Sequence, residues 1–190
     1  MIEELVKKNR SYRRFDEKVK ISESELHAWV NLGRLSASGA NIQPLKYIIS
    51  ADKKLNELIF PSLAWAGALK DWPGPIEGER PTAYIIILGD TTISKNTGVD
   101  HGIAAQSILL GAVEDGFGGC MIGTVNKSKV AKLLNLPENL EILLVIALGK
   151  PIEKVVLDDV KDGDIKYWRD EKDVHHVPKR LLDELVYKSY

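Results

Sequence analysis

Two long apolar runs constrain the fold of this chain more than any other feature. The run TAYIIILGD at 82–90 and the run LEILLVIALG at 140–149 show no alternation of apolar and polar side chains. A strand with one face in water would alternate, so both runs predict strands that are buried on both faces. Gly149 and Pro151 stop the second strand. We therefore predict that both belong to a central sheet.

Segments with helical spacing separate these strands. Ser22 and Glu25 form the pattern of a capping box, which predicts a helix over about 22–35. Small and apolar residues between Gly98 and about Asp115 predict a second helix, either in the core or at a dimer interface. We expect further short helices at 52–60, 128–135 and 178–189, a strand at 45–50, and a glycine-rich strand or turn at 116–125.

The order of these elements indicates an α/β or an α+β fold. The predicted strands are too few for a complete doubly wound sheet. A chain of 190 residues fits one domain, or one protomer whose core a partner completes. We predict a single domain over residues 1–190, with irregular structure from residue 152 to the last helix.

Composition excludes several functional classes. The 26 Lys and Arg residues balance the 27 Asp and Glu residues, so no overall field attracts nucleic acid or an anionic membrane. The single cysteine, Cys120, excludes an internal disulfide framework and fits a reducing compartment. The chain has neither a signal-peptide core nor an apolar run near the roughly 18 residues of a membrane span. We expect a cytoplasmic protein that binds anions, if at all, through a local cluster.

The segment NRSYRRF at 9–15 is such a cluster. Arg10, Arg13 and Arg14 surround the hydroxyl of Ser11. Three arginines this close are either a solvated face or a phosphate site, in which guanidinium forks and a hydroxyl bind the oxygens. Lys179 and Arg180 form a second cationic pair that would close over the same phosphate.

Two further segments have the composition of a cofactor site. GFGGCMIG at 116–123 matches neither the dinucleotide nor the P-loop fingerprint. Its glycines either pack closely within a sheet or bring the backbone against a flat ligand. The loop SASGANIQP at 36–44 offers Ser38, Asn41 and Gln43, whose polar groups suit the ring edge of a planar cofactor.

The sequence gives little support for a metal or a protein nucleophile. His101, His175 and His176 have no Cys or carboxylate at a ligand spacing, and adjacent histidines on a loop are usually solvated. Cys120 has no base near it in the sequence, which favours a small buried thiol. We predict no metal site.

Taken together, RSYRRF, SASGANIQP, GFGGCMIG, ALGKP and the late basic pair resemble the FMN-dependent nitroreductase family. The resemblance spans nearly the whole chain and implies an α+β fold, in which helices flank a mixed, mostly antiparallel sheet that an intertwined homodimer completes. It implies two FMN sites at the subunit interface, each built from both chains. NADH or NADPH would reduce FMN at N5 in a ping-pong cycle, and nitroaromatics, quinones or similar two-electron acceptors would reoxidise it.

The resemblance also implies roles for individual residues. Arg10 and Ser11 would bind the phosphate and ribityl part of FMN, and Arg13 would reach the pyrimidine edge, where a cation favours hydride acceptance. No residue of the protein would act as a catalytic nucleophile or acid. The remaining predicted contacts with FMN come from Ser38, Gly39, Asn41 and Gln43, from Ile122 and Gly123, and from Lys179 and Arg180.

The chain departs from the family pattern at two positions. The family often has an arginine where Asn9 stands and a proline where Ala37 stands. Three other residues have open roles: Trp65 and Trp72 either roof a substrate pocket or pack elsewhere, and Lys70 either touches the ribityl chain or is solvated. Two other functions fit the same residues, a flavin carrier or sensor without turnover and a dimeric regulatory domain that binds another phosphate.

Overall fold

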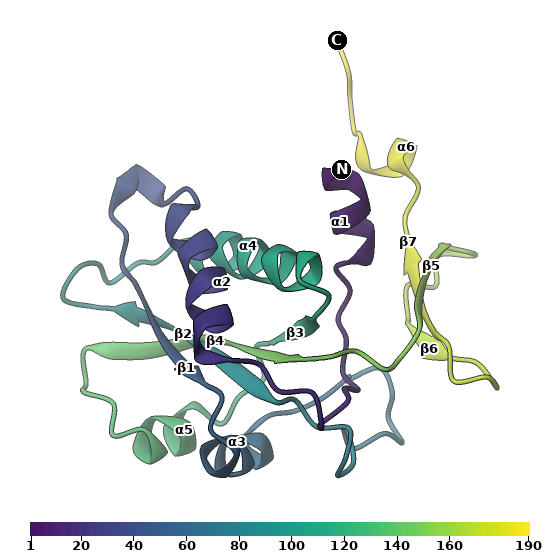
Figure 1. Cartoon of the computed structure of the whole chain (residues 1–190). Coiled ribbons are helices and arrows are strands. Elements are labelled where there is room, and N and C mark those ends of the chain that lie inside the picture. The colour runs from purple at the N-terminus through teal and green to yellow at the C-terminus, as the bar shows by residue number, and fades with distance from the viewer. The chain divides into compact units, whose positions relative to one another are not determined.

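β2 (Ala83–Asp90) is one of the two inner strands of a four-stranded sheet, and every one of its residues is buried. The computed structural model describes all 190 residues. β2 pairs with β1 (Leu45–Ser50) and β4 (Leu140–Gly149), and β3 (Gly118–Ile122) pairs with the outer edge of β4. This sheet, β1-β2-β4-β3, is antiparallel throughout (Figure 1). Full burial is confirmed for β2 and for the second half of β4.

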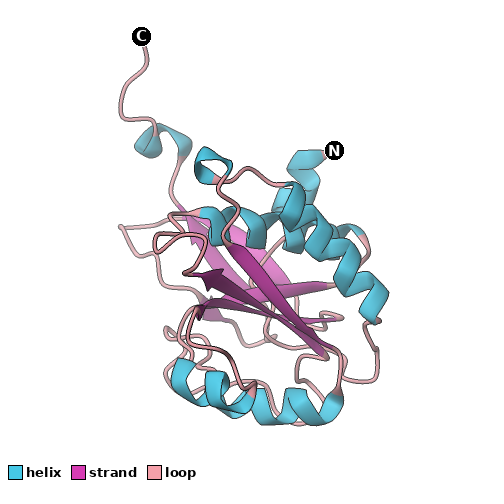
Figure 2. Ribbon diagram, turned by 90° about the vertical axis from the view of Figure 1, so that its left-hand side faces the viewer, coloured by secondary structure: helices cyan, strands magenta, loops and turns pink.

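Helices cover both faces of this sheet (Figure 2). α2 (Glu23–Leu35) and α4 (Asp100–Glu114) lie on one face, and α3 (Lys53–Ile59) and α5 (Lys127–Leu133) lie on the other. Successive side chains of β2 enter opposite cores, because strand side chains alternate between faces. The predicted α+β architecture is therefore confirmed.

α2 and α4 approach each other closely because a glycine stands at each point of contact. A Cβ atom on Gly111 would collide with Leu32, and one on Gly33 would lie 3.1 Å from Cδ1 of Ile108. The capping box at Ser22 is present as predicted, with both of its hydrogen bonds. Most of one face of α4 is buried against α2 and the sheet, which confirms the core-helix alternative.

Three short elements complete this part of the chain. α1 (Ile2–Lys8) packs against α4, and 3-10 turns form at Gly39–Asn41 and Phe60–Ser62.

None of the helices has both the length and the apolar character that a membrane span requires.

Contacts divide the chain into two units. The first comprises Met1–Trp65 and Gly74–Ile152 and contains the sheet just described. The second comprises Ala66–Pro73 and Glu153–Tyr190. The single domain over residues 1–190 stays a prediction.

The second unit contains a three-stranded sheet, and the expectation of irregular structure from residue 152 is wrong. Its order is β5 (Val155–Asp159), β7 (His175–Lys179) and β6 (Trp168–Arg169), with β5 parallel to β7. Pro178 lies inside β7 rather than at a helix start, and only one turn of the predicted last helix forms, α6 (Leu182–Leu185).

An ion pair under an aromatic ring organises the interior of the second unit. Arg169 Nη2 lies 3.1 Å from Oε2 of Glu153, whose side chain is only 1% exposed. The Arg169 guanidinium also stacks over the ring of Trp72, 4.4 Å from its centre. Trp72 therefore has a packing role within this unit.

His176 is a paired residue on β7, so the expectation of a solvated histidine loop is wrong. Its Nδ1 lies 2.8 Å from Asp158 on β5, its Nε2 lies 3.4 Å from Asp170, and its ring stacks on Trp168. The hydrogen bond with Asp158 raises the pKa of His176 above its usual range, and Asp170 adds to the effect.

We predict that this pairing makes the second unit more stable at pH 6 than at pH 9. A raised folded-state pKa means that the stabilisation is complete below the unfolded pKa of about 6.5 and is lost as the pH rises through the folded value. Amide hydrogen exchange of β7, corrected for intrinsic exchange rates, measures the stability of the second unit at each pH. H176Q should remove the difference in stability between pH 6 and pH 9. The control H27Q, at an exposed position on α2, should keep that difference. A wild-type protein with the same exchange at both pH values would contradict the role of the His176 pair.

Candidate functional site

The arginine segment and the glycine-rich strand lie side by side, although more than 100 residues separate them in the sequence. Ser11 forms a parallel bridge with Gly119, and the amide of Tyr12 donates to the Gly119 carbonyl at 3.0 Å. The segment after α1 therefore extends the sheet at the free edge of β3. Two of the predicted FMN-binding segments are thus adjacent within one chain.

Arg10 carries an unmet hydrogen-bond donor. Its Nη2 donates to the carbonyl of Val6 at 2.6 Å, while its Nε is buried and has no partner. Burial lowers the pKa of this guanidinium, which nevertheless remains charged at any physiological pH. A bound anion would both satisfy Nε and offset the cost of burying the charge.

The other two arginines of the cluster differ in their surroundings. Arg13 is half-buried and donates from Nη1 to the main-chain carbonyl of Ser11 at 3.2 Å, which holds its guanidinium near the backbone of this segment. Arg14 forms a two-pronged ion pair with Glu79, at 2.8 and 2.7 Å, and holds the chain together there. Asn9, where the family often has arginine, is buried at the end of α1.

The two glycines of β3 and Gly123, which follows the strand, have different surroundings. A Cβ atom on Gly119 would collide with the carbonyl oxygen of Ala147, and one on Gly118 would lie 2.6 Å from the Tyr12 ring. These glycines are required for close packing within the sheet, which is the first of the two alternatives. Gly123 is exposed and its Cβ direction is open, while the neighbouring Ile122 is buried.

We predict different effects of alanine substitution on the free energy of unfolding at Gly119 and at Gly123. G119A should destabilise the protein by about 1–3 kcal/mol, because the new methyl group meets backbone that cannot move aside. G123A should leave the stability of the FMN-free protein unchanged within about 0.5 kcal/mol, because nothing lies within 4 Å of the new atom. Urea unfolding measures both, and equal losses would contradict the packing role of Gly119.

The loop at 38–43 is organised by Asp100, at the start of α4. The Ser38 hydroxyl donates to Oδ2 at 2.6 Å, and the Gly39 amide donates to Oδ1 at 3.0 Å. The Gln43 amide in turn donates to the Ser38 hydroxyl at 2.9 Å. Ser38 and Gly39 therefore fix the shape of the loop. No sequence signal connects Asp100 to this loop, and it was not among the predicted residues.

The backbone of this loop adopts a conformation that side chains disfavour. Ala40, Asn41 and Gln43 have φ values of 48°, 56° and 54°. Strain of this kind persists where surrounding contacts determine the conformation, and it is common at ligand sites. The Asn41 and Gln43 side chains are exposed. Beside them lies a cavity of about 160 Å³, lined among others by Ala37, Ser38, Tyr47 and Asp100.

The loop and the arginine segment lie at opposite ends of α4 in one chain. Asp100 holds the loop at the first residue of the helix, and β3 follows its last turn (Figure 1). A helix of 15 residues is about 22 Å long. The two groups of predicted residues are therefore not brought together within one chain.

The remaining predicted residues have varied surroundings. Lys179 ends β7 and is exposed, and Arg180 is exposed and lies 3.4 Å from Glu184. Lys70 is exposed. Trp65 is half-buried against Phe60, with ring centres 5.7 Å apart.

The histidines and the cysteine weighed for metal or nucleophilic chemistry lie apart from any cluster of metal ligands. No group of three or more His, Cys, Asp or Glu residues is arranged to hold a metal ion. Cys120 is buried on β3 and forms no disulfide, which confirms the small buried thiol. His101 is half-buried on α4, and His175 is buried on β7.

Comparison with known proteins decides the family. The sequence model of the nitroreductase family matches residues 6–150, which include the arginine segment, the 38–43 loop and β3. The chain belongs to the nitroreductase family. The resemblance recognised in the sequence is therefore confirmed.

Individual nitroreductases and related proteins are distant in sequence but similar in fold. An NADPH-flavin oxidoreductase of Vibrio harveyi is 47% identical over 55 residues, which cover 28% of this chain and 23% of that protein. A candidate NADH dehydrogenase/NAD(P)H nitroreductase of Archaeoglobus fulgidus is 22% identical over 95% of this chain and 92% of its own. The structure of an FMN-dependent nitroreductase of Clostridium difficile has a TM-score of 0.65 and 21% identity, covering 81% of this chain and 89% of its own.

Proposed function

We propose that this chain is an FMN-dependent NAD(P)H oxidoreductase that reduces nitroaromatics, quinones or similar two-electron acceptors in a ping-pong cycle. The observation that carries the proposal is the pairing of the Ser11 segment with β3. This pairing brings Arg10, whose Nε has no hydrogen-bond partner, to the strand that precedes the open Gly123. Membership of the nitroreductase family, and relatives named as flavin oxidoreductases, support the same activity.

The residues of the arginine segment fit the phosphate of FMN. The buried Nε of Arg10 lacks a hydrogen-bond partner, and the exposed Ser11 hydroxyl lies next to it in the chain. Guanidinium and hydroxyl donors together match the oxygens of a phosphate monoester. Lys179 and Arg180 belong to the second unit, and their contact with the phosphate stays a prediction.

The far end of the cofactor would lie against β3. Gly123 leaves open the space that a Cβ atom would occupy, which allows a flat ring to approach Ile122 and Gly123. Bound FMN would supply the hydride chemistry that protein side chains lack. Arg13 would place a fixed positive charge at the pyrimidine edge, where negative charge develops on reduction.

We infer that the loop at 38–43 serves the site of a second copy of the chain. Asp100 holds the loop at the first residue of α4, whereas β3 follows the last turn of this helix of 15 residues, so we expect Asn41 and Gln43 to contact a ring on β3 across an interface. An open groove lined by Leu5, Leu32, Leu35 and Leu110 between α1, α2 and α4 gives that interface an apolar surface. Light scattering should give twice the mass of the 21.1 kDa chain; a monomer that still turns over would contradict a shared site.

Steady-state oxidation of NADH and NADPH tests the proposed activity. Purified protein loaded with FMN should consume nucleotide when menadione or a nitroaromatic is added, with parallel double-reciprocal plots, as a ping-pong cycle requires. Bound FMN without turnover would instead identify a carrier or sensor. Protein that takes up no FMN would support the anion-binding regulatory domain.

A further inference from the structure

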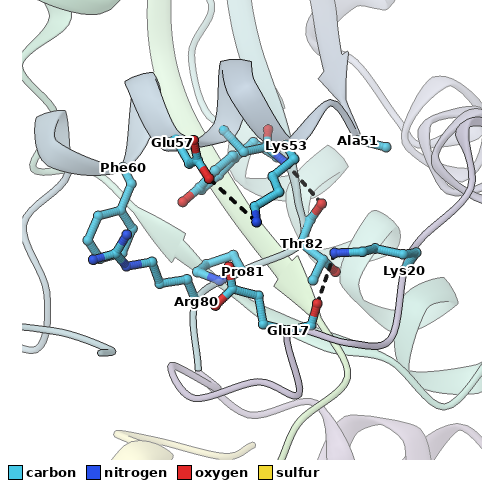
Figure 3. Close-up of a pocket in the computed structure, with 11 residues that line it drawn as sticks. Glu17, Lys20, Ala51, Lys53, Glu57, Phe60, Arg80, Pro81 and Thr82 are labelled. Atoms are coloured by element: carbon cyan, nitrogen blue, oxygen red, sulfur yellow. Dashed lines mark hydrogen bonds and ion pairs between the residues drawn. The ribbon is translucent and has the colours of Figure 1, made fainter. Parts of the chain in front are cut away.

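A small cavity on the α3 side of the sheet contains none of the residues assigned to FMN. Its volume is about 90 Å³, and its walls come from the segment 17–20, from α3 and from residues 80–84 (Figure 3). A cavity of about 150 Å³ is known to hold a benzene ring. This one is therefore too small for an isoalloxazine or nicotinamide ring and suits a compact group.

Arg80 presents a fixed guanidinium at this cavity. Its guanidinium carbon lies 4.6 Å from the centre of the Phe60 ring, so the flat group is held against an aromatic face. Nε of Arg80 is buried and has no hydrogen-bond partner. A buried donor without a partner is costly, and a ligand oxygen in the adjacent cavity would relieve that cost.

Thr82 contributes a second unmet group. Its residue is only 6% exposed, and its hydroxyl Oγ1 has no hydrogen-bond partner. The backbone around it is fixed, because its carbonyl accepts from Nδ2 of Asn56 at 2.9 Å and its amide donates to Leu148 at 2.9 Å. Asn56 is itself bonded to the Ser50 hydroxyl at 2.7 Å. The hydroxyl is thus held at the cavity before any ligand arrives.

The charges around the cavity favour an anion. The ends of Lys20 and Lys53 lie on either side of Thr82 (Figure 3). Of the two carboxylates in the walls, Glu17 already accepts from the Gly78 amide at 2.6 Å, and Glu57 lies 3.8 Å from Lys53. The Lys20 ammonium also donates to the main-chain carbonyl of Glu17 at 2.9 Å. The three cations Arg80, Lys20 and Lys53 face two carboxylates and leave one net positive charge.

We propose that this cavity binds a small oxyanion with the chemistry of phosphate, either the free ion or the phosphate group of a larger ligand. Arg80 and the Thr82 hydroxyl donate to its oxygens, and Lys20 and Lys53 balance its charge. This site is separate from the FMN phosphate site at Arg10, and it requires no flavin chemistry.

Calorimetric titration of FMN-loaded protein with inorganic phosphate tests the site, because bound FMN already fills its own phosphate site. Potassium chloride of equal ionic strength is the reference. We expect one saturable site per chain, with a dissociation constant of about 1 mM. R80Q should weaken binding at least about tenfold and T82V several-fold, because each removes one donor. K54Q should bind like the wild type, because Lys54 lies next to Lys53 on α3 but does not line the cavity.

Titration with phenyl phosphate distinguishes the free ion from the phosphate group of a larger ligand. Equal affinity would indicate the phosphate group of a larger ligand, and binding of inorganic phosphate alone would indicate the free ion. Absence of saturable binding would overturn the proposal and mean that the cavity holds only water. Binding that R80Q and T82V leave unchanged would overturn it as well, and thermal unfolding of both variants checks that they are folded.

Discussion

Replacing Arg10 by alanine should weaken FMN binding about a hundredfold. The guanidinium is half-buried, and its Nε has no partner in the protein, so the residue is prepared for an anion. Hydrogen bonds to charged groups contribute about 1.5–3 kcal/mol each, and two of them correspond to at least two orders of magnitude in affinity. Quenching of flavin fluorescence during titration of the FMN-free protein measures the dissociation constant.

Two variants control for charge and for folding. R10K keeps the positive charge but loses the planar fork, so we expect an intermediate affinity. K8A removes an exposed cation two residues away and should bind FMN like the wild type. An R10A variant with wild-type affinity would place the phosphate elsewhere.

Replacing Arg13 by alanine should slow reduction of bound flavin by NAD(P)H about a hundredfold, while FMN affinity falls only several-fold. A fixed charge aimed at the position where negative charge develops acts mainly on the transition state, and removing one such group typically costs a factor of 10² to 10³. Anaerobic stopped-flow absorbance gives the reduction rate, and fluorescence titration gives the affinity.

Lysine at position 13 separates charge from shape. R13K should recover part of the reduction rate, because a cation remains near the same place. Equal losses of rate and affinity in R13A would mean that Arg13 only binds the cofactor. The assigned electrostatic role would then be wrong.

Local features of the fold could be predicted from the sequence. The capping box at Ser22 depends on residues three positions apart, and burial of β2 follows from its own composition. The strands of the second unit were missed because they are short and half-exposed, with polar ends such as VVLDD and HHVPK. The sequence favours a helix start at Pro178, whereas the structure places this proline inside β7, which is possible where a strand needs no amide donor.

The segments of the candidate site could be predicted from the sequence, but their arrangement in space could not. The sequence indicated an arginine cluster and a glycine-rich strand, yet only the fold brings Ser11 to Gly119. The sequence also could not distinguish Arg14 from its neighbours, because its partner Glu79 is 65 residues away. Long-range pairs of this kind follow from packing, which local patterns do not contain.

Anaerobic absorbance spectroscopy of the FMN-free protein, titrated first with FMN and then with NADH or NADPH, tests whether this chain is a flavin oxidoreductase. We expect flavin bands that appear on uptake of FMN, bleach when NADH or NADPH is added, and return when menadione is added. The nucleotide that bleaches them faster identifies the preferred donor. Failure to take up FMN, or flavin bands that persist with both nucleotides, would contradict the assignment of this chain as a flavin oxidoreductase.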